Sequence, residues 1–296
     1  MNIMITGGTG LLGKALIDSK ERDDEVLVTY LGNYTVPDQG EIKYLKLDIL
    51  DQAGHEKIFR EFKPEVVIHT ASIGSPDYAE QHQELTWSIN VDGTDKLAEL
   101  CDRHGARLIY ISSNGIYDGD QAPYSEDAIA RPINYYGRTK LEGERRALKA
   151  RNLPAIVRPI LMYGWNNTYE RDNIVSMSLK KFNKGETVKA YDDVFSNSLL
   201  ADECARAIWR IIETKATGAF NIAGAERASI YALLRTAAKI FGFAEDLVKP
   251  VKQGYFNELV KRPVDTSYDT TKMEKVLKIA PLSLVEGLTR MKAAQK

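Results

Sequence analysis

The sequence has little cysteine, no excess of charge of either sign and no long apolar run. Its two cysteines, Cys101 and Cys204, lie far apart, and the start "MNIMITGGTG" has no leader-like pattern. We therefore expect a reducing, cytoplasmic location rather than a disulfide framework. No apolar run is long enough to cross a bilayer, so no membrane span is expected. A formal net charge of -1 offers no basic excess for a nucleic-acid backbone.

The chain alternates short β-branched runs with longer helical patterns. With 296 residues, 44% hydrophobic and 27% charged, it is typical of one large or two interlocked globular domains. The expected strands are Asn2–Thr6, Glu25–Tyr30, Lys43–Leu47, Glu65–His69, Arg107–Ser112, Pro154–Pro159 and Gly218–Gly224. The expected helices are Leu11–Lys20, Gln52–Phe62, Ala79–His104, Asn134–Arg151 and Leu200–Glu213. Strands and helices in this order predict an α/β fold, a Rossmann-type doubly wound parallel sheet.

A smaller C-terminal α/β substrate domain is expected beside this sheet, because the alternation loosens beyond Tyr163. We assign residues 1–161 and 187–222 to the dinucleotide-binding Rossmann domain. Residues 162–186 and 223–296 are assigned to the smaller substrate-binding domain, whose tail from about Glu226 is predicted to be helix and loop.

The segment "TGGTGLLG" carries Gly7, Gly10 and Gly13 between the first strand and the first helix. Glycines at this spacing let backbone N–H groups approach a pyrophosphate at the positive end of a helix. The position of the motif predicts a dinucleotide site.

The choice of dinucleotide depends on the residues after the second strand. NAD enzymes usually carry an acidic residue there for the ribose hydroxyls, and "VTYLGNY" offers none. This favours NADP(H), with NAD(H) possible, and Lys14 is the nearest cation in the sequence. Asp48 could reach the adenine amino group or could cap the following helix.

A Tyr-x-x-x-Lys pattern occurs twice, as Tyr136/Lys140 and as Tyr268/Lys272. Only the first copy follows a strand end with hydroxyl groups, in "ISSNGIYDG", where ligands of open α/β sheets bind. Ser113, Tyr136 and Lys140 can therefore converge on one point, whereas we expect the second copy on a solvated surface turn.

The chemistry of this trio suits reduction of a carbonyl group. A phenol has a pKa of about 10, and a nearby ammonium would lower it. Tyr136 would then be a usable general acid, with Ser113 hydrogen-bonded to the same carbonyl oxygen.

On these motifs, with "VVIHTAS", "INVDGT", "YYGRTK" and "RPILMYG", the chain resembles the extended short-chain dehydrogenase/reductase superfamily. The segments "LLADECARAI" and "RPVDTSYDTTKMEK" resemble, more narrowly, the dTDP-4-dehydrorhamnose reductase group. This resemblance implies NAD(P)H-dependent reduction of a nucleoside-diphosphate-linked 4-keto-6-deoxysugar. It implies Ser113, Tyr136 and Lys140 as catalytic residues. Cofactor contacts are expected from Gly7, Thr9, Gly10, Leu11, Leu12, Asp48, Ile49, Thr70, Ala71, Ser72, Tyr136, Lys140 and Pro159.

Substrate contacts are expected from Ser113, Asn114, Tyr136, Asn166 and Arg262. The guanidinium of Arg262 suits a diphosphate, although Arg262 could equally be a structural surface residue and Asn166 part of a plain polar loop. The Asn114-Gly115 step lacks the acid and base that dehydratases of this branch carry. Ala15 stands where some relatives have a metal-binding glutamate, so no metal is expected.

Two further groups of residues are expected to have structural roles. Cys101 and His104 form half of a zinc pattern with no second half nearby, so we expect a buried thiol and a helix-end histidine. His69, at the end of a strand, is not expected to be catalytic.

Two alternatives to the reductase remain open. One is a nucleotide-sugar epimerase on the same fold. The other is a non-catalytic NADP-binding regulatory subunit, like the β subunit of methionine adenosyltransferase. A homodimer is a possible assembly in each case.

Overall fold

The larger part of the molecule is built on one parallel sheet. The computed structural model describes residues 1–20 and 23–295. Within these ranges seven strands pair in the order β11-β6-β5-β4-β1-β2-β3, all parallel. They are β1 (Asn2–Thr6), β2 (Glu25–Tyr30), β3 (Ile42–Lys46), β4 (Val66–His69), β5 (Arg107–Ile111), β6 (Ala155–Pro159) and β11 (Gly218–Ile222). The order reverses between β1 and β4, which confirms the doubly wound Rossmann-type sheet.

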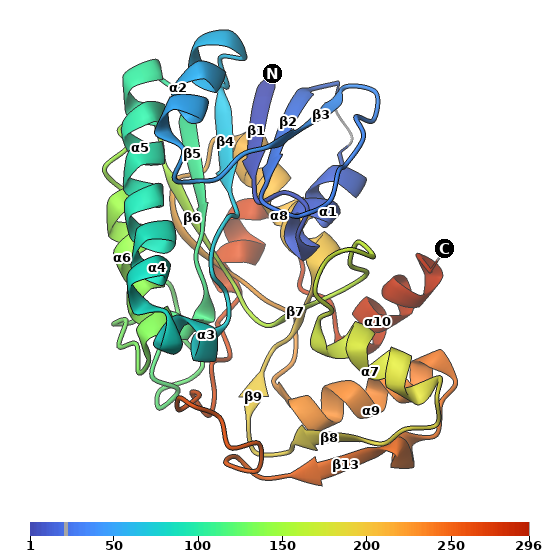
Figure 1. The fold of residues 1–296 in the computed structure, drawn as a ribbon. Coiled ribbons are helices and arrows are strands. Elements are labelled where there is room, and N and C mark those ends of the chain that lie inside the picture. The colour runs from blue at the N-terminus through green and yellow to red at the C-terminus, as the bar shows by residue number, and fades with distance from the viewer. Residues whose placement is uncertain (21–22, 296) are drawn as a thin grey trace.

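Helices cover both faces of this sheet (Figure 1). One face carries α2 (Gln52–Glu61), α5 (Gly93–His104) and α6 (Tyr135–Ala147), and the other carries α1 (Leu11–Asp18) and α8 (Ala201–Thr214). Each face has its own apolar cluster, because the strands are buried on both sides. Cys101 lies in the cluster under α5 and Cys204 in the cluster under α8, both as free buried thiols.

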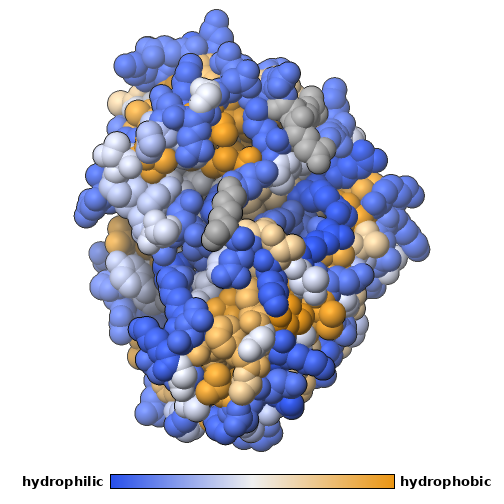
Figure 2. Space-filling model, turned by 90° about the vertical axis from the view of Figure 1, so that its right-hand side faces the viewer, coloured by the Kyte–Doolittle hydropathy of each residue, from blue (hydrophilic) through white to orange (hydrophobic). Residues whose placement is uncertain are grey.

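A smaller part lies below the sheet in Figure 1. Its helices are α7 (Ile174–Phe182), α9 (Ile230–Phe241) and α10 (Leu284–Ala293). Its strands pair as β8 (Val188–Tyr191) with β13 (Val248–Val251), β7 (Met162–Tyr163) with β10 (Leu199–Leu200), and β9 (Phe195–Ser196) with β12 (Ala228–Ser229). Short helical turns lie at η2 (Asn114–Ile116), η3 (Glu245–Leu247) and η4 (Met273–Leu277). A third apolar cluster holds this part together, and Figure 2 shows apolar surface gathered in the same lower half.

The predicted domain boundary remains a prediction, but one segment bears on it. The boundary assigns Val188–Tyr191 to the larger domain, whereas this strand pairs with Val248–Val251 and contributes Val188 and Ala190 to the third cluster. The tail also contains strands as well as helix and loop, because β13 completes this pair.

The helix expected over Ala79–His104 is instead a chain of shorter pieces. It begins earlier, at α3 (Pro76–Gln81) behind the Ser75 cap, and continues through α4 (Gln83–Trp87) and a π-helical turn, η1 (Ser88–Asp92), into α5. His82 interrupts it with φ -127 and ψ 58. In the π turn the Asn90 side chain accepts a hydrogen bond from Ile73 N (2.8 Å) and donates to Thr139 Oγ1 (3.1 Å). These bonds tie the segment to the loop after β4 and to α6.

In the second Tyr-x-x-x-Lys copy Tyr268 is buried and Lys272 is half-buried, so the expected place on a solvated turn is wrong. Tyr268 is only 4% exposed and meets the Tyr117 ring edge-on at 5.9 Å. Lys272 Nζ donates to Ala219 O (2.7 Å). Burial of the aromatic ring, rather than proton chemistry, accounts for Tyr268.

A buried ion pair fastens α6 to the sheet. Arg158 on β6 donates to Glu144 on α6 through Nε (2.8 Å) and Nη2 (2.7 Å), a two-point pairing. Ser112 Oγ donates to the same carboxylate (2.5 Å), and Arg158 Nη1 donates to Tyr117 OH (3.0 Å). Every charged atom of the pair therefore has a hydrogen-bonding partner, which a buried pair requires to be tolerated.

We predict that Glu144→Gln lowers the free energy of unfolding by about 3–5 kcal/mol, because it leaves the buried Arg158 without its counter-charge. Urea unfolding at pH 7 measures this change. Glu142→Gln is the matched control on the same helix. Glu142 pairs with Arg145 and Arg146 near the surface, so its loss should cost less than about 1 kcal/mol. Equal costs for the two variants would contradict the special role of Glu144.

Candidate active site

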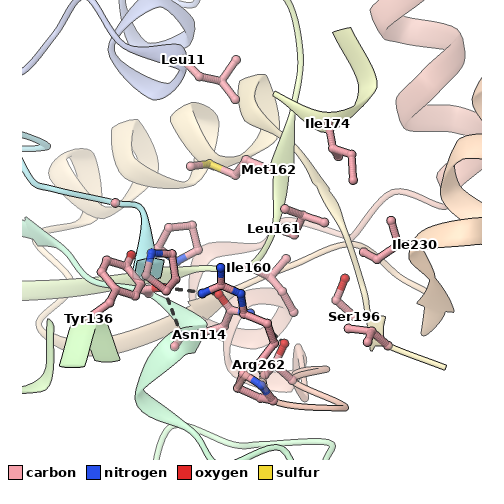
Figure 3. A pocket seen from close by; sticks show the side chains of 18 of the residues that line it. Leu11, Asn114, Tyr136, Ile160, Leu161, Met162, Ile174, Ser196, Ile230 and Arg262 are labelled. Atoms are coloured by element: carbon pink, nitrogen blue, oxygen red, sulfur yellow. Dashed lines mark hydrogen bonds between the residues drawn. The ribbon is translucent and has the colours of Figure 1, made fainter. Parts of the chain in front are cut away.

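A cavity of about 820 Å³ opens where the carboxyl ends of the strands face the smaller part. In Figure 3, Tyr136, Asn114 and Arg262 gather at one side of it and Leu11 lies at another. Ile160, Leu161 and Met162 stand between them, with Ile174, Ser196 and Ile230 opposite. Both parts of the molecule therefore build one pocket, of the size usual for small-molecule sites.

The glycine-rich turn forms one end of this pocket. Gly7 has a φ of 64°, and a Cβ added there would lie 2.7 Å from Ala71 Cα. A Cβ on Gly13 would lie 2.2 Å from Gly8 O, so α1 packs directly on the turn. Gly10 precedes the helix without a side-chain cap. The first N–H groups of α1 are thus left for a ligand, and anions bind at such helix ends.

The predicted cofactor residues divide into two groups. Those that line the pocket are Gly7, Gly10, Leu11, Leu12, Thr70, Ser72, Tyr136 and Pro159. The pocket lining does not include Thr9, Asp48, Ile49, Ala71 or Lys140. All of them stay predictions, but the first group shares one cavity.

Three of the residues outside the pocket lining, Asp48, Ile49 and Ala71, make structural contacts. Asp48 Oδ1 accepts from Leu50 N (2.9 Å) in a tight turn, and the cap of α2 is Asp51, not Asp48. Ile49 packs beside Gly93, where an added Cβ would lie 3.1 Å from Ile49 Cγ1. Ala71 packs directly against Gly7.

Ser113 and Tyr136 meet at the end of β5. A Cβ added to Gly115 would lie 3.1 Å from Tyr136 Cε1 and 3.4 Å from Ser113 Oγ, so Gly115 admits both side chains to one point. Ser113 Oγ accepts from Gly115 N (3.1 Å) and donates to Asn114 Oδ1 (3.3 Å). Asn114 Nδ2 in turn donates to Thr266 Oγ1 (2.7 Å), which couples this strand end to the smaller part.

The expected lowering of the Tyr136 pKa is not found in the protein itself. Burial raises the pKa of Tyr136, and the hydrogen bond with Ser113 lowers it only in part. Lys140 does not contribute to the pKa shift of Tyr136, and its Nζ donates to Ile111 O. At neutral pH the phenol is therefore protonated, which suits a proton donor.

Lys140 is buried under the strand end, one turn beyond Tyr136. Its Nζ donates to Ile111 O (2.6 Å) and lies 4.5 Å from the centre of the Tyr110 ring. Burial lowers the pKa of Lys140 to about 7, while the neighbouring Glu144 carboxylate acts to raise it. The residue can thus gain or lose a proton near neutrality.

His69, which is not expected to be catalytic, makes two buried side-chain contacts. Its ring is hydrogen-bonded between Thr6 Oγ1 (2.7 Å) and Thr94 Oγ1 (3.1 Å). Burial lowers the pKa of His69 to about 3, so the ring is neutral.

The predicted substrate residues are not all brought together. Ser113, Asn114, Tyr136 and Arg262 line the pocket, but Asn166 lies outside it and bonds Arg171 O (2.8 Å) and Asn173. Arg262 is paired with Asp77 (2.8 Å) and Glu258 (3.5 Å), which hold its fork beside the cavity. Nη1 of Arg262 is buried without a hydrogen-bonding partner among the described residues.

Sequence reasoning missed most of the apolar wall of the pocket. Ile160, Leu161, Met162, Ile174, Val194 and Ile230 line it. They come from chain segments that lie far apart in the sequence and that short strands such as β7, β9, β10 and β12 bring together, and short strands carry too little pattern to be predicted. Lys181 and Lys189 add two cations to this half of the pocket.

Two other classes of site have no counterpart within residues 1–20 and 23–295. These residues contain no group of three or more His, Cys, Asp or Glu side chains placed to hold a metal ion. No helix among them has the length and apolar character to span a membrane.

The parallel sheet, the glycine-rich turn at its switch point and the tyrosine–lysine helix define a short-chain dehydrogenase/reductase of the extended type. The full chain, residues 1–296, matches the family model described as RmlD substrate binding domain. The chain belongs to this family, whose fold is that of NAD(P)-dependent oxidoreductases.

Individual relatives point in two directions. Methionine adenosyltransferase 2 subunit beta of Xenopus laevis is 30% identical over 292 residues, 92% of this chain and 81% of that protein. A dTDP-4-keto-6-deoxy-D-glucose reductase of Streptomyces niveus is 27% identical over 252 residues, 84% of this chain and 81% of that protein. The crystal structure of a dTDP-4-dehydrorhamnose reductase from Clostridium acetobutylicum superimposes with a TM-score of 0.86, at 26% identity and 99% coverage of both chains.

We predict that Lys140 makes stability depend on pH. Its pKa of about 7 in the folded protein is below the value of about 10.4 in an unfolded chain. The buried ammonium therefore costs stability most below pH 7, and this cost fades as pH rises toward 10. Relative to Lys140→Met, the wild type should gain free energy of unfolding over this range, by at most about 1.4 kcal/mol per pH unit.

Denaturant unfolding of both proteins at pH 6, 7.5, 9 and 10 tests this dependence. Lys149→Met is the control, because the side chain of Lys149 is 57% exposed. A difference between wild type and Lys140→Met that stays flat with pH would contradict the shift.

Proposed function

We propose that this protein is an NAD(P)H-dependent reductase of a nucleoside-diphosphate-linked 4-keto-6-deoxysugar. The observation that carries the proposal is that Ser113 and Tyr136 meet in the same cavity as the glycine-rich turn. The family and the reductases among its relatives support the reaction class. NADP(H) is the first choice of cofactor, with NAD(H) possible, and the free thiols of both cysteines fit a cytoplasmic location.

The bound dinucleotide would supply the hydride that adds to the carbonyl carbon. Tyr136 gives its phenolic proton to the carbonyl oxygen as negative charge develops there, and Ser113 donates a hydrogen bond to the same oxygen. A raised pKa keeps Tyr136 protonated for this step. Solvent then returns a proton to the Tyr136 phenolate, and Lys140 holds the end of β5 through its hydrogen bond to Ile111 O.

The smaller part of the molecule would hold the sugar nucleotide. Arg262, Lys181 and Lys189 line this half of the cavity and can pair with a diphosphate. The apolar wall formed by Leu161, Met162 and Ile230 suits the methyl-bearing face of a 6-deoxysugar and excludes water from the reacting carbonyl.

A second candidate is a dinucleotide-binding subunit of a larger enzyme. The similarity to methionine adenosyltransferase 2 subunit beta favours it, because it extends over 92% of the chain. Such a role needs the cofactor turn but not proton transfer by Tyr136. Stable copurification with a methionine adenosyltransferase, together with no NADPH consumption, would support this candidate.

We predict that Tyr136→Phe lowers kcat for reduction of dTDP-4-keto-6-deoxyglucose by about 10²–10⁴-fold, because the proton donor is lost. NADPH oxidation followed at the nicotinamide absorbance measures the rate. Binding of the dinucleotide should change far less than kcat.

Tyr135→Phe is the matched control for this substitution. Tyr135 is the preceding residue on α6, but its hydroxyl donates to Gln83 O (3.2 Å) at the surface. Its removal should leave the rate nearly unchanged. If Tyr136→Phe retains the wild-type rate, Tyr136 is not the proton donor.

A further inference from the structure

A loop from the smaller part lies across the glycine-rich turn. This loop, residues 164–173, connects β7 to α7. Asn167 Nδ2 donates to Thr9 O (2.8 Å), and the Tyr169 ring lies 4.2 Å from the Tyr34 ring. Tyr34 is also stacked on Tyr30 at 5.5 Å, with 8° between the ring planes. The loop is thus fastened to the end of β2 as well as to the turn.

Glu170 is the charged residue of this contact. Its Oε1 accepts from Thr9 Oγ1 (2.7 Å) and from the Tyr34 hydroxyl, and the two hydroxyls are 2.8 Å apart. Two hydroxyl donors therefore hold the Glu170 carboxylate. One of them, Thr9, is only 4% exposed. Both bonds go to Oε1, and among the described residues no hydrogen bond to Oε2 is found.

The carboxylate of Glu170 lies where a dinucleotide-binding fold holds the adenosine ribose. In a Rossmann-type fold the adenosine ribose lies beyond the end of the second strand, beside the glycine-rich turn, and an acidic residue there accepts a hydrogen bond from the 2′-hydroxyl. Tyr34 follows β2, and Thr9 belongs to the turn. Glu170, 136 positions away from Tyr34, thus places an acidic side chain beside the residues that follow β2, where the local sequence has none.

Among the described residues no ion pair joins Glu170 to a cation, the adjacent and exposed Arg171 included. Lys14, the nearest cation in the sequence, is paired with Asp18 on its own helix. A 2′-phosphate carries about two negative charges. It would lie within reach of the Glu170 carboxylate, and like charges at such distances repel. A 2′-hydroxyl would instead find a free acceptor oxygen.

We propose that Glu170 is the residue that discriminates between the two dinucleotides, by accepting a hydrogen bond from a free 2′-hydroxyl and repelling a 2′-phosphate. The proposal rests on the proposed function, because it needs a dinucleotide at the glycine-rich turn. The Glu170 carboxylate would shift the binding preference of the wild type toward NAD(H), compared with the preference predicted from the end of β2 alone.

The test is the affinity of the purified full-length protein for NADPH and NADH, measured separately by titration calorimetry. Glu170→Gln keeps the size of the side chain and removes its charge. We expect the ratio of the NADPH Kd to the NADH Kd to fall at least tenfold, through tighter NADPH binding, weaker NADH binding or both. An unchanged ratio would overturn the role of Glu170.

Asp172→Asn is the control for a lost charge in the same loop. Asp172 pairs with Lys180 of α7 rather than with the turn, so the ratio should stay at the wild-type value. A shift as large as that of Glu170→Gln would mean that the charge of the loop, not Glu170, discriminates. If the wild type binds neither dinucleotide, the proposed function itself fails, and this outcome is separate from an unchanged ratio.

Discussion

The buried pair of Glu144 and Arg158 is the interaction on which the site depends most. It joins α6, which carries Tyr136 and Lys140, to β6, and it also holds Ser112, the neighbour of Ser113. A two-point guanidinium–carboxylate contact fixes both distance and rotation of the helix. Tyr136 and Ser113 can therefore meet around Gly115. Placing such a pair in the interior is costly, and its hydrogen bonds to Ser112 and Tyr117 keep that cost acceptable.

Burial decides the resting protonation states of the two titrating groups beside the site. Burial raises the pKa of Tyr136 and lowers that of Lys140, so each group is held toward its neutral form. The protonated phenol is the form of Tyr136 that gives a proton to a carbonyl oxygen during reduction, and the same side chain takes a proton back in the reverse direction.

Much of the larger part could be predicted from the sequence, because its signals are local. Buried parallel strands such as Val66–His69 are continuous apolar runs, and the glycines of the first turn stand at a fixed spacing. The meeting of Ser113 and Tyr136 could be predicted because a strand end precedes Tyr136, whereas Lys140 is not part of the pocket lining. Tyr268, whose spacing to Lys272 is the same, was misplaced because its burial comes from packing against Tyr117, which no local pattern reports.

The rest of the site depends on contacts between distant segments. Glu170 reaches Thr9 across 161 positions, and Thr266 reaches Asn114 across 152. Glu170 stands in no motif. Thr266 lies in "RPVDTSYDTTKMEK", but nothing in that segment predicts its contact with Asn114. The apolar wall is likewise assembled from short strands and loop ends, so only the folded chain brings its members together.

Transfer of isotope from cofactor to sugar tests the central claim most directly. The protein would be given dTDP-4-keto-6-deoxyglucose and NADPH or NADH deuterated at the transferable position of the nicotinamide, and the product examined by NMR. A reductase places deuterium on C4 of the sugar, in equal amount to the oxidised dinucleotide formed. A sugar without deuterium at C4, recovered while the dinucleotide is bound, would contradict the account.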